Sequence, residues 1–567
     1  MHESAERYDV IIVGSGAGGG MSAYVLTGAG MNVLMLEAGR HYDPVAESSM
    51  FNTPAQAPLR AEATSDKPFG YYDATVDGGW SVPDEPYTVA PGSEFLWWRP
   101  RMLGGRTNHW GRIALRFGPY DFKPYSRDGL GVDWPVTYED IAPWYDKTER
   151  LIGVIGRAEN IENLPDSPPD CHLPPPPMRA NEIFMERGFA SMGIKVAAMR
   201  MAVLTRSLNG RAACLYATPC SYGCSIRANF QSTTVLLPPA LATGKLAIRT
   251  NALVHRVELG ANGKATGVAY VDRKTGKQRE ARAKAVVLSA GAAESARILL
   301  NSKSARFPQG LANSNGMVGR YLMDTVGTGT LAQFPALEGL PAANEDGISN
   351  AHIYVPWWGH GLQARQKLDF PRGYHIEPWG GKYMPDLGLN GVTNALRSSY
   401  GASLREEVKA KYGSTLYFMG RGEMIPNEDC YCDLDPIVTD KWGVPVLRFH
   451  WKWSEHELRQ AAHQRKTFLE FTERMGGKAI SGTEPDGKKA ISKGGEIIHE
   501  VGTCRMGDSA KNSVVNQFGQ CWDVRNLFIM DGAVMASSPD KNPTLSILAL
   551  SWRSSDFLAE EARKGNL

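Results

Sequence analysis

The sequence predicts an α/β fold in which a parallel-sheet domain is interleaved with an α+β domain built on an antiparallel sheet. Two observations predict the first domain: residues 8–13 form a short β-branched run, and a glycine-rich turn follows it at once. Such a run is typical of a buried parallel strand. A third observation predicts the other domain, because residues 330–470 show alternating strand-like runs with many tryptophans and tyrosines.

The expected elements of the first half follow in chain order. A helix fits residues 20–28 after the glycine turn, and a strand over 32–37 completes a βαβ unit. Residues 44–100 show no period and are rich in Pro, Gly and aromatic side chains, which predicts a long excursion. Helical spacing marks residues 139–151, whereas the prolines of 163–178 predict an extended connector.

In the second half, strand and hairpin patterns cover residues 246–290, and a strand–helix pattern occurs again near the C-terminus. There, a strand over 526–531 precedes a helix that we expect from Thr544 to about Arg563. Tryptophans between 350 and 460 are expected to be core residues more than substrate platforms.

Size and charge exclude several classes of protein. The 567 residues exceed the ~250–300 at which one core usually splits, so at least two domains are expected. A net charge of +2 without single-sign runs does not suggest nucleic acid or an anionic membrane as a partner. No apolar run reaches the ~18 residues of a spanning helix, and no signal peptide is visible at the N-terminus. We therefore expect a cytoplasmic protein, or one that is exported folded with a partner that carries the signal.

The glycine turn is a dinucleotide fingerprint. Gly14, Gly16 and Gly19 form G-x-G-x-x-G between the first strand and the first helix, where free N–H groups meet a pyrophosphate. Glu37 stands at the end of the second strand, where an acid accepts hydrogen bonds from ribose hydroxyls. An acid at this position favours an unphosphorylated ribose, which means FAD or NAD.

Three cysteines lie close together in the loop 212–226. Cys214, Cys220 and Cys224 are soft ligands in a Pro- and Gly-containing run, which suits an iron–sulfur cluster. A zinc ion with a fourth ligand from elsewhere, or a disulfide between two of the three, remains an alternative. The other five cysteines are scattered, do not look like a disulfide scaffold and are expected to be structural.

Beyond these features, the chain resembles the glucose–methanol–choline (GMC) oxidoreductases over essentially its full length. The matching segments occur in the family's order: 14–19, 36–39, the flavin-wrapping loop 101–111, Val254, 290–291, 317–324, 499–507, 531–532 and 542–544. One departure is Thr325, which stands where many members carry His.

The resemblance implies FAD as cofactor and a division of the chain into two discontinuous domains. The FAD-binding domain would comprise 6–45, 90–115, 240–330 and 500–567, and the substrate-binding domain 116–239 and 331–499. The FAD-contacting residues would be Gly14, Gly16, Gly19, Glu37, Gly104, Asn108, His109, Val254, Gly291, Asp531, Gly532 and Thr544. In some relatives the histidine that corresponds to His109 is bonded covalently to the flavin, and in others it is not.

The resemblance also implies the catalytic pair. His499 would be the base that removes the hydroxyl proton, because a neutral imidazole suits proton transfer near neutral pH. Asn542 would hold the substrate hydroxyl, or it would cap the helix that starts near Pro543, or it would do both.

Within the family, the chain looks most like the catalytic subunits of bacterial FAD-dependent sugar dehydrogenases, and among them the glucoside 3-dehydrogenases. The cysteine spacing resembles their three-iron (3Fe-4S) cluster site. This implies oxidation of a secondary sugar hydroxyl, at C3, with electrons relayed to a cytochrome c or a quinone. It also implies a small accessory subunit that carries the export signal to the periplasm.

Three other functions are weighed against this one. The first is an FAD sugar oxidase that uses oxygen, the second a gluconate-, sorbitol- or fructose-type dehydrogenase, and the third a non-catalytic flavoprotein or redox-sensing binder.

Overall fold

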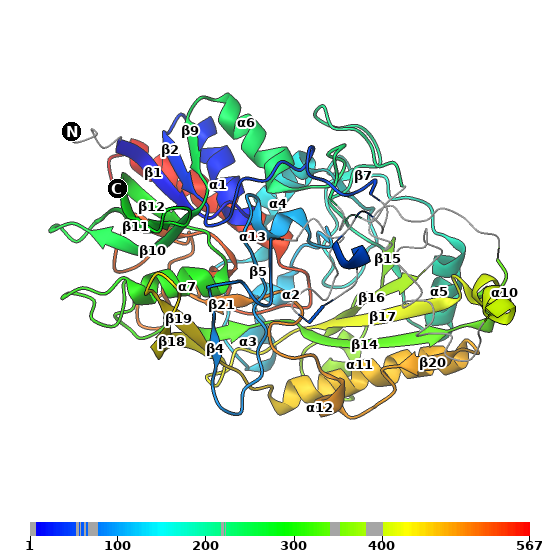
Figure 1. The fold of residues 1–567 in the computed structure, drawn as a ribbon. Coiled ribbons are helices and arrows are strands. Elements are labelled where there is room, and N and C mark those ends of the chain that lie inside the picture. The colour runs from blue at the N-terminus through cyan, green and yellow to red at the C-terminus, as the bar shows by residue number, and fades with distance from the viewer. Residues whose placement is uncertain are drawn as a thin grey trace.

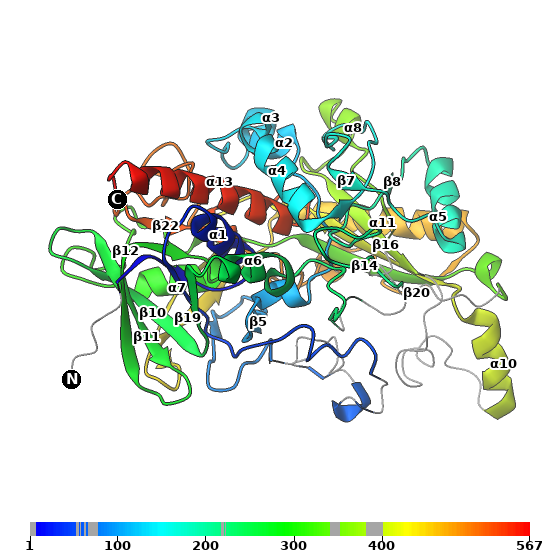
Figure 2. The same cartoon turned by 90° about the horizontal axis from the view of Figure 1, so that it is seen from above.

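Two sheets lie at opposite ends of an elongated molecule in the computed structural model (Figures 1 and 2). The structure describes residues 7–52, 56, 58–61, 64–65, 77–216, 220, 223–340, 352–380 and 401–567. Parts of the predicted excursion 44–100 and of the predicted substrate-binding segment 331–499 lie outside the described residues. The mixed α/β architecture agrees with the predicted fold class.

The seven-stranded sheet begins with the predicted βαβ unit. Its order is β10-β11-β12-β1-β2-β9, with β22 paired to the far half of β12. The strands are β1 (Arg7–Val13), β2 (Val33–Leu36), β9 (Leu246–Arg249), β10 (Ala252–Leu259), β11 (Ala265–Asp272), β12 (Gln278–Leu288) and β22 (Leu527–Ile529). β1, β2, β9, β12 and β22 run parallel, and their apolar side chains are almost all buried, as expected for strands covered on both faces.

Two helices pack together against this sheet. Helix α1 (Ala17–Gly28) begins three residues before the predicted start, because Gly16 takes the N-cap position directly after the turn. Helix α13 (Thr544–Arg563) has the predicted bounds and packs against α1 and α4 (Tyr138–Ile152). The N-terminal end of α13 points toward the junction of the two halves of the molecule (Figure 2).

The second sheet is antiparallel, as the alternating pattern predicts. Its order is β16-β17-β14-β20, made of β14 (Val326–Gln333), β16 (Tyr374–Gly380), β17 (Thr415–Gly422) and β20 (Lys478–Ser481). Helix α11 (Glu455–Arg474) lies along one side of it (Figure 1). Phe334, Phe418 and Phe471 form an aromatic core with their neighbours. Trp357 and Trp451 are buried, in agreement with a core role.

A five-stranded sheet connects the two ends. Its order is β21-β13-β18-β19-β4, made of β4 (Thr88–Val89), β13 (Arg320–Met323), β18 (Tyr431–Thr439), β19 (Pro445–His450) and β21 (Val501–Thr503). Helix α7 (Ala292–Asn301) packs on it. Because β13 runs directly into β14 and pairs with β21, the segment before β21 lies beside the start of the second sheet.

The remaining helices and strands are short or peripheral. They are β3 (Gly78–Gly79), β5 (Arg99–Pro100), α2 (Pro119–Phe122), α3 (Pro124–Asp128), β6 (Val154–Ile155), β7 (His172–Leu173), α5 (Ala180–Ser191), β8 (Ala197–Ala198), α6 (Leu237–Ala242), β15 (Ile353–Tyr354), α8 (His360–Ala364), α10 (Gly401–Lys411) and α12 (Gly487–Ala490). In the predicted connector 163–178, the only strand among the described residues is β7, so most of it is irregular.

One buried side chain joins three strands of the first sheet. Asn526, just before β22, donates to the carbonyls of Ala265 (2.7 Å) and Lys284 (2.6 Å). Its own Oδ1 accepts from the Ala265 amide at 2.9 Å. A single amide therefore satisfies three backbone groups where β11, β12 and β22 meet.

We predict that Asn526→Ala lowers the free energy of unfolding by about 2–3 kcal/mol, because it leaves buried backbone groups without partners. The matched control is Asn262→Ala, in the exposed turn between β10 and β11, which should stay within about 0.5 kcal/mol of wild type. Urea unfolding followed by circular dichroism measures both. Equal unfolding midpoints for the two variants would contradict the role of Asn526.

Candidate active site

The glycine turn is shaped for a pyrophosphate. Gly14 has φ +95°, and a Cβ there would lie 2.4 Å from the Ser289 carbonyl oxygen. A Cβ on Gly19 would lie 2.0 Å from the Gly14 carbonyl oxygen. Gly16 differs, because a Cβ there would meet no atom within 4 Å, and it stands at the N-terminus of α1. Gly14 and Gly19 thus serve tight packing, while Gly16 leaves open space where backbone N–H groups meet an anion.

Glu37 is bound to the same turn. Its Oε2 accepts from the backbone N–H (3.1 Å) and the hydroxyl (2.5 Å) of Ser15, and its Oε1 accepts from the Gly39 N–H at 2.7 Å. Each carboxylate oxygen has two acceptor positions, so Oε1 can still accept a ribose hydroxyl. The carboxylate is therefore fixed beside the turn, as a dinucleotide site requires.

The loop predicted to wrap the flavin is anchored on this turn. The Gly104 N–H donates to the Ser15 hydroxyl at 2.8 Å, and Gly104 itself has φ +93°. Asn108 is fully buried, donates to the Leu103 carbonyl at 2.9 Å and accepts from the Thr233 hydroxyl at 3.3 Å.

His109 follows in the same loop. Its Nε2 lies 3.0 Å from the Trp98 indole N–H. An indole nitrogen can only donate, so Nε2 accepts and Nδ1 carries the proton. Nδ1 is buried without a hydrogen-bond partner among the described residues. Burial, with help from the charges of Arg112 and Arg106, lowers the pKa of His109 well below its ordinary value.

Asp531 joins the ends of two parallel strands. Its Oδ2 accepts from the Gly291 N–H (3.0 Å) and the Ser295 hydroxyl (2.6 Å), and its Oδ1 from the Ala533 N–H (2.8 Å). Gly291 has φ +96°, and a Cβ there would meet no atom within 4 Å. Gly532 begins the turn that follows Asp531, and Val254 is buried in β10 of the same sheet.

His499 is held on three sides. Its backbone N–H donates to Asp324 Oδ1 at 3.0 Å, and its Nδ1 lies 3.0 Å from the Thr325 hydroxyl. Arg106 bonds the residues on either side of it, with an ion pair to Glu500 and a 3.2 Å hydrogen bond to the Ile498 carbonyl. When Nδ1 donates to Thr325, the lone pair of Nε2 is left for a substrate.

The His499 imidazole is neutral at ordinary pH. Burial lowers its pKa to about 3, and the positive charge of Arg421 acts in the same direction. The charge of Glu377 opposes this shift in part. Arg421 and Glu377 therefore act on the imidazole through their charges.

Asn542 does not cap helix α13, whose N-terminus has no side-chain cap. Its Nδ2 instead donates to Glu377 Oε1 at 3.0 Å, and its Oδ1 is buried without a partner among the described residues. Pro543 is the N-cap residue and Thr544 begins the helix. Glu377 is therefore the partner of Asn542, and its charge also acts on His499.

Three charged or titratable residues of this site were missed from the sequence: His375, Glu377 and Arg421. His375 and Glu377 are two positions apart on β16, and Arg421 of β17 lies opposite His375. All three side chains therefore share one face of the sheet. The alternation His375-x-Glu377 in a strand is the only local signal. This pattern predicts a polar face of the strand, but it does not predict which distant residue contacts that face.

The three clustered cysteines line one pocket, together with the apolar side chains of Met50, Val203 and Ile226. Peptide N–H groups point at two sulfurs, from Tyr216 to Cys214 (3.3 Å) and from Ala228 to Cys224 (3.2 Å). Burial raises the pKa of the Cys224 thiol.

The cysteine geometry bears on the alternatives. Cys220 and Cys224 carry free thiols, which leaves no pair for a disulfide among the three. Among the described residues, the three sulfurs are not all within 4.8 Å of one another. A tetrahedral zinc with bonds of about 2.3 Å would hold them about 3.8 Å apart. The five scattered cysteines are buried thiols, as expected.

A short segment links this pocket to the flavin-wrapping loop. Four residues after Cys224, the chain enters residues 228–234. There the Phe230 carbonyl accepts from the Trp110 indole at 3.2 Å, and the Ser232 N–H donates to the Thr107 hydroxyl at 2.9 Å. The pocket and the loop are therefore neighbours along a continuous chain.

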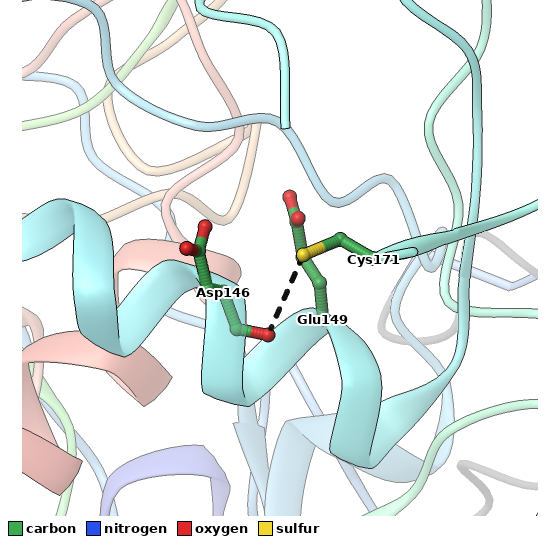
Figure 3. Close-up of side chains that lie close together, drawn as sticks. All are labelled: Asp146, Glu149 and Cys171. Carbon is green, nitrogen blue, oxygen red and sulfur yellow. Dashed lines mark hydrogen bonds between the residues drawn. The ribbon is translucent and has the colours of Figure 1, made fainter. Parts of the chain in front are cut away.

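A second group of possible metal ligands has its two carboxylates already paired with an arginine. Ligand atoms of Asp146, Glu149 and Cys171 lie within 4.8 Å of one another, near the end of α4 (Figure 3). Arg116 Nη2 already binds both carboxylates, at 2.7 Å and 2.5 Å. Burial, together with the two carboxylates, raises the pKa of the Cys171 thiol to about 11. A neutral thiol beside an occupied carboxylate pair does not suit a cation.

Comparison with known proteins identifies the family. The GMC oxidoreductase family matches residues 8–326 with its N-terminal part and 426–551 with its C-terminal part. The chain belongs to the GMC oxidoreductases. Membership in this family implies FAD, and the open space over Gly16 with the fixed Glu37 carboxylate fits that cofactor.

Individual relatives cover nearly the whole chain. The 2-methyl-1,2-propanediol dehydrogenase of Mycolicibacterium austroafricanum is 29% identical, over 99% of this chain and 96% of its own length. The fructose dehydrogenase large subunit of Gluconobacter japonicus is 26% identical, over 98% of each. The crystal structure of pyridoxine 4-oxidase from Mesorbium loti has a TM-score of 0.61 at 16% identity, over 98% of this chain and 99% of that one, and shows the same fold.

Among the described residues, no helix is both long enough and apolar enough to cross a membrane.

We predict that Gly16→Val lowers the flavin content of purified protein at least about tenfold, because the side chain would enter the space that a pyrophosphate needs. The fold should persist, since Gly16 has an ordinary φ of −68° and no protein atom nearby. Gly28→Val at the other end of α1, where a Cβ also meets nothing within 4 Å, is the matched control. Flavin absorbance per protein measures both variants, and equal retention would place the pyrophosphate elsewhere.

Proposed function

We propose that this protein is an FAD-dependent dehydrogenase that oxidises a secondary hydroxyl of a sugar or glycoside, at C3, to a ketone. The observation that carries the proposal is His499, a neutral imidazole oriented by Thr325 and Asp324. Glu377, which binds Asn542 and whose charge acts on His499, supports the predicted catalytic pair.

The chemistry divides between cofactor and chain. When bound, FAD supplies the acceptor for the hydride that leaves the alcohol carbon. His499 Nε2 takes the hydroxyl proton, so the alcohol loses two electrons and two hydrogens in total and becomes a carbonyl. Asn542 positions the reacting alcohol beside the imidazole, and a well-placed alcohol is the main requirement when the cofactor performs the redox step.

The substrate class is supported by the relatives and by the polar face of the second sheet. The two similar enzymes are named for a diol and for fructose, both of which carry several hydroxyls. A face with His375, Glu377 and Arg421 suits a hydrogen-bonding ligand better than an apolar one. An alternative is a gluconate-, sorbitol- or fructose-type dehydrogenase, which would use the same catalytic pair.

We predict that His499→Asn slows anaerobic flavin reduction by substrate by about 10²–10⁴-fold, because the base is lost. Flavin content should not change. Since the base of the wild type is neutral above a pKa of about 3, its protonation should not reduce kcat/KM between pH 5 and 8. His255→Asn, on the exposed edge of β10, is the matched control and should keep the wild-type rate. Stopped-flow absorbance at 450 nm measures all three, and a His499→Asn rate near wild type would refute the base.

The proposal includes an iron–sulfur cluster of the 3Fe-4S type held by Cys214, Cys220 and Cys224. The shared pocket, its apolar lining and the two N–H donors to sulfur support this donor set. When bound, such a cluster supplies a one-electron exit toward a cytochrome c or a quinone. An FAD oxidase that passes electrons to oxygen is the alternative.

The partners follow from the same proposal. A similar protein is named as the large subunit of a dehydrogenase, which supports a small accessory subunit for this chain. We propose that this subunit carries the export signal, so that the complex acts in the periplasm and reduces a cytochrome c there. A cytoplasmic location is the alternative.

We predict that Cys220→Ser abolishes the electron paramagnetic resonance signal of the anaerobically purified complex and slows reduction of cytochrome c at least about tenfold. Flavin reduction by methyl glucoside should stay within about threefold of wild type, because the catalytic pair is untouched. Cys432→Ser, which replaces a buried structural thiol, controls for loss of a cysteine as such. An iron-free wild type that forms peroxide, with Cys220→Ser unaffected, would establish the oxidase instead.

A further inference from the structure

The carboxylate of Glu377 determines which way the amide of Asn542 faces. Glu377 lies inside the protein, 1% exposed, on β16. Burial by itself would raise its pKa, but the charge of Arg421 and the hydrogen bonds from His375 and Asn542 hold that pKa at about 2. The group is therefore an anion at ordinary pH, and an anionic carboxylate accepts hydrogen bonds without donating any.

An acceptor of this kind allows only one orientation of its partner. Asn542 directs its NH₂ group to Glu377 Oε1 at 3.0 Å, so its carbonyl oxygen faces away from the carboxylate. That Oδ1 atom is buried without a partner among the described residues, in a side chain only 7% exposed. An unpaired buried carbonyl is unfavourable in a protein interior, and it gains when a ligand donates to it.

Arg421 offers donors next to the same carboxylate. Its Nε lies 3.2 Å from Glu377 Oε2. Among the described residues, its terminal nitrogens make only long contacts, to the Gly420 carbonyl at 3.4 Å and the Met419 sulfur at 3.5 Å. The positive charge of Arg421 also lowers the pKa of His499.

These groups together match one kind of ligand. On either side of the Glu377 carboxylate, the chain presents an acceptor, Asn542 Oδ1, and the donors of Arg421. A neutral hydroxyl both donates and accepts, and so it satisfies both partners. A carboxylate would satisfy Arg421 alone and would face the Asn542 carbonyl and the Glu377 anion, whereas a methylene would satisfy neither.

We infer that Glu377 is a positioning residue that orients Asn542, and that Asn542 and Arg421 select substrates with a second hydroxyl next to the carbon that is oxidised. This inference rests on the proposed function and specifies its substrate as a vicinal diol. The second N–H of Asn542 stays available to the reacting hydroxyl, while the neighbouring hydroxyl donates to Oδ1 and accepts from Arg421.

The test compares anaerobic flavin reduction by methyl glucoside and by its 2-deoxy, 3-deoxy and 4-deoxy analogues. In the wild type, the 2-deoxy or the 4-deoxy glucoside should lose at least about 30-fold in efficiency relative to the parent, because a missing hydroxyl leaves buried partners unpaired. In Glu377→Gln, where the amide of Asn542 is free to turn, this discrimination should fall below about threefold. A merely structural residue would lower both rates together and leave their ratio unchanged.

Two further variants keep the test decisive. Arg421→Lys retains the charge beside Glu377 but loses the second donor, and should also lose most of the discrimination if Glu377→Gln fails to fold. Glu338→Gln, after the far end of β14, is the matched control and should keep the wild-type ratio.

Three results would count against the inference. Equal rates for the parent and both the 2-deoxy and 4-deoxy sugars in the wild type would overturn the diol selection. Unchanged discrimination in Glu377→Gln would overturn its positioning role. Reduction by the 3-deoxy glucoside at the parent rate would instead overturn the proposed C3 oxidation, on which the inference rests.

Discussion

The candidate site depends on the buried carboxylate of Asp324, which joins two sheets and the segment that carries His499. Asp324 lies between β13 of the five-stranded sheet and β14 of the four-stranded sheet. It accepts backbone N–H groups from Thr325 (2.8 Å), His499 (3.0 Å) and Ile497 (3.3 Å). Burial, with the nearby charge of Glu500, raises its pKa to about 7. His499 is therefore bound to the residue at which the five-stranded sheet passes into the four-stranded sheet.

Charge compensation keeps this region ordered around a neutral base. Glu500 is paired with Arg106, and Glu377 with Arg421, so each of these two anions has its own cation. The opposite charges of Arg421 and Glu377 act on His499 in opposite directions. Burial is therefore the largest cause of its lowered pKa. In the proposed role of base, an imidazole with such a low pKa would be a weak proton acceptor, so its alignment with the substrate and the bound cofactor would supply much of the rate.

Local sequence patterns predicted most of the fold. The β-branched strand with its glycine turn, the hairpins of 246–290 and the helix that begins at Thr544 all depend on neighbours in sequence, and each lies where expected. The start of α1 was placed too late, because glycine residues lower helix propensity even where an N-terminal turn favours them. The three cysteines were found together because the first and the last are only ten positions apart in the sequence.

The polar partners of the site could not be predicted in the same way. Glu377 and Asn542 are 165 residues apart, and no period in the sequence connects a strand residue with the residue before a helix. The capping role considered for Asn542 was wrong for this reason, since a tertiary partner replaced the local one. His499 and Asn542 were identified by resemblance, while the residues that orient them became visible only when the strands were paired.

The segment 228–234 makes the thiol pocket and the flavin-wrapping loop a single mechanical unit. The Ala228 N–H of this segment donates to the Cys224 sulfur in the pocket. Further along it, Phe230 and Ser232 form hydrogen bonds with Trp110 and Thr107 of the flavin-wrapping loop. Mutations in this segment therefore affect the cysteine pocket and the flavin-wrapping loop together. A descendant that lost the three cysteines could not simply delete their loop, because the residues that follow it also hold the flavin-wrapping loop through Thr107 and Trp110.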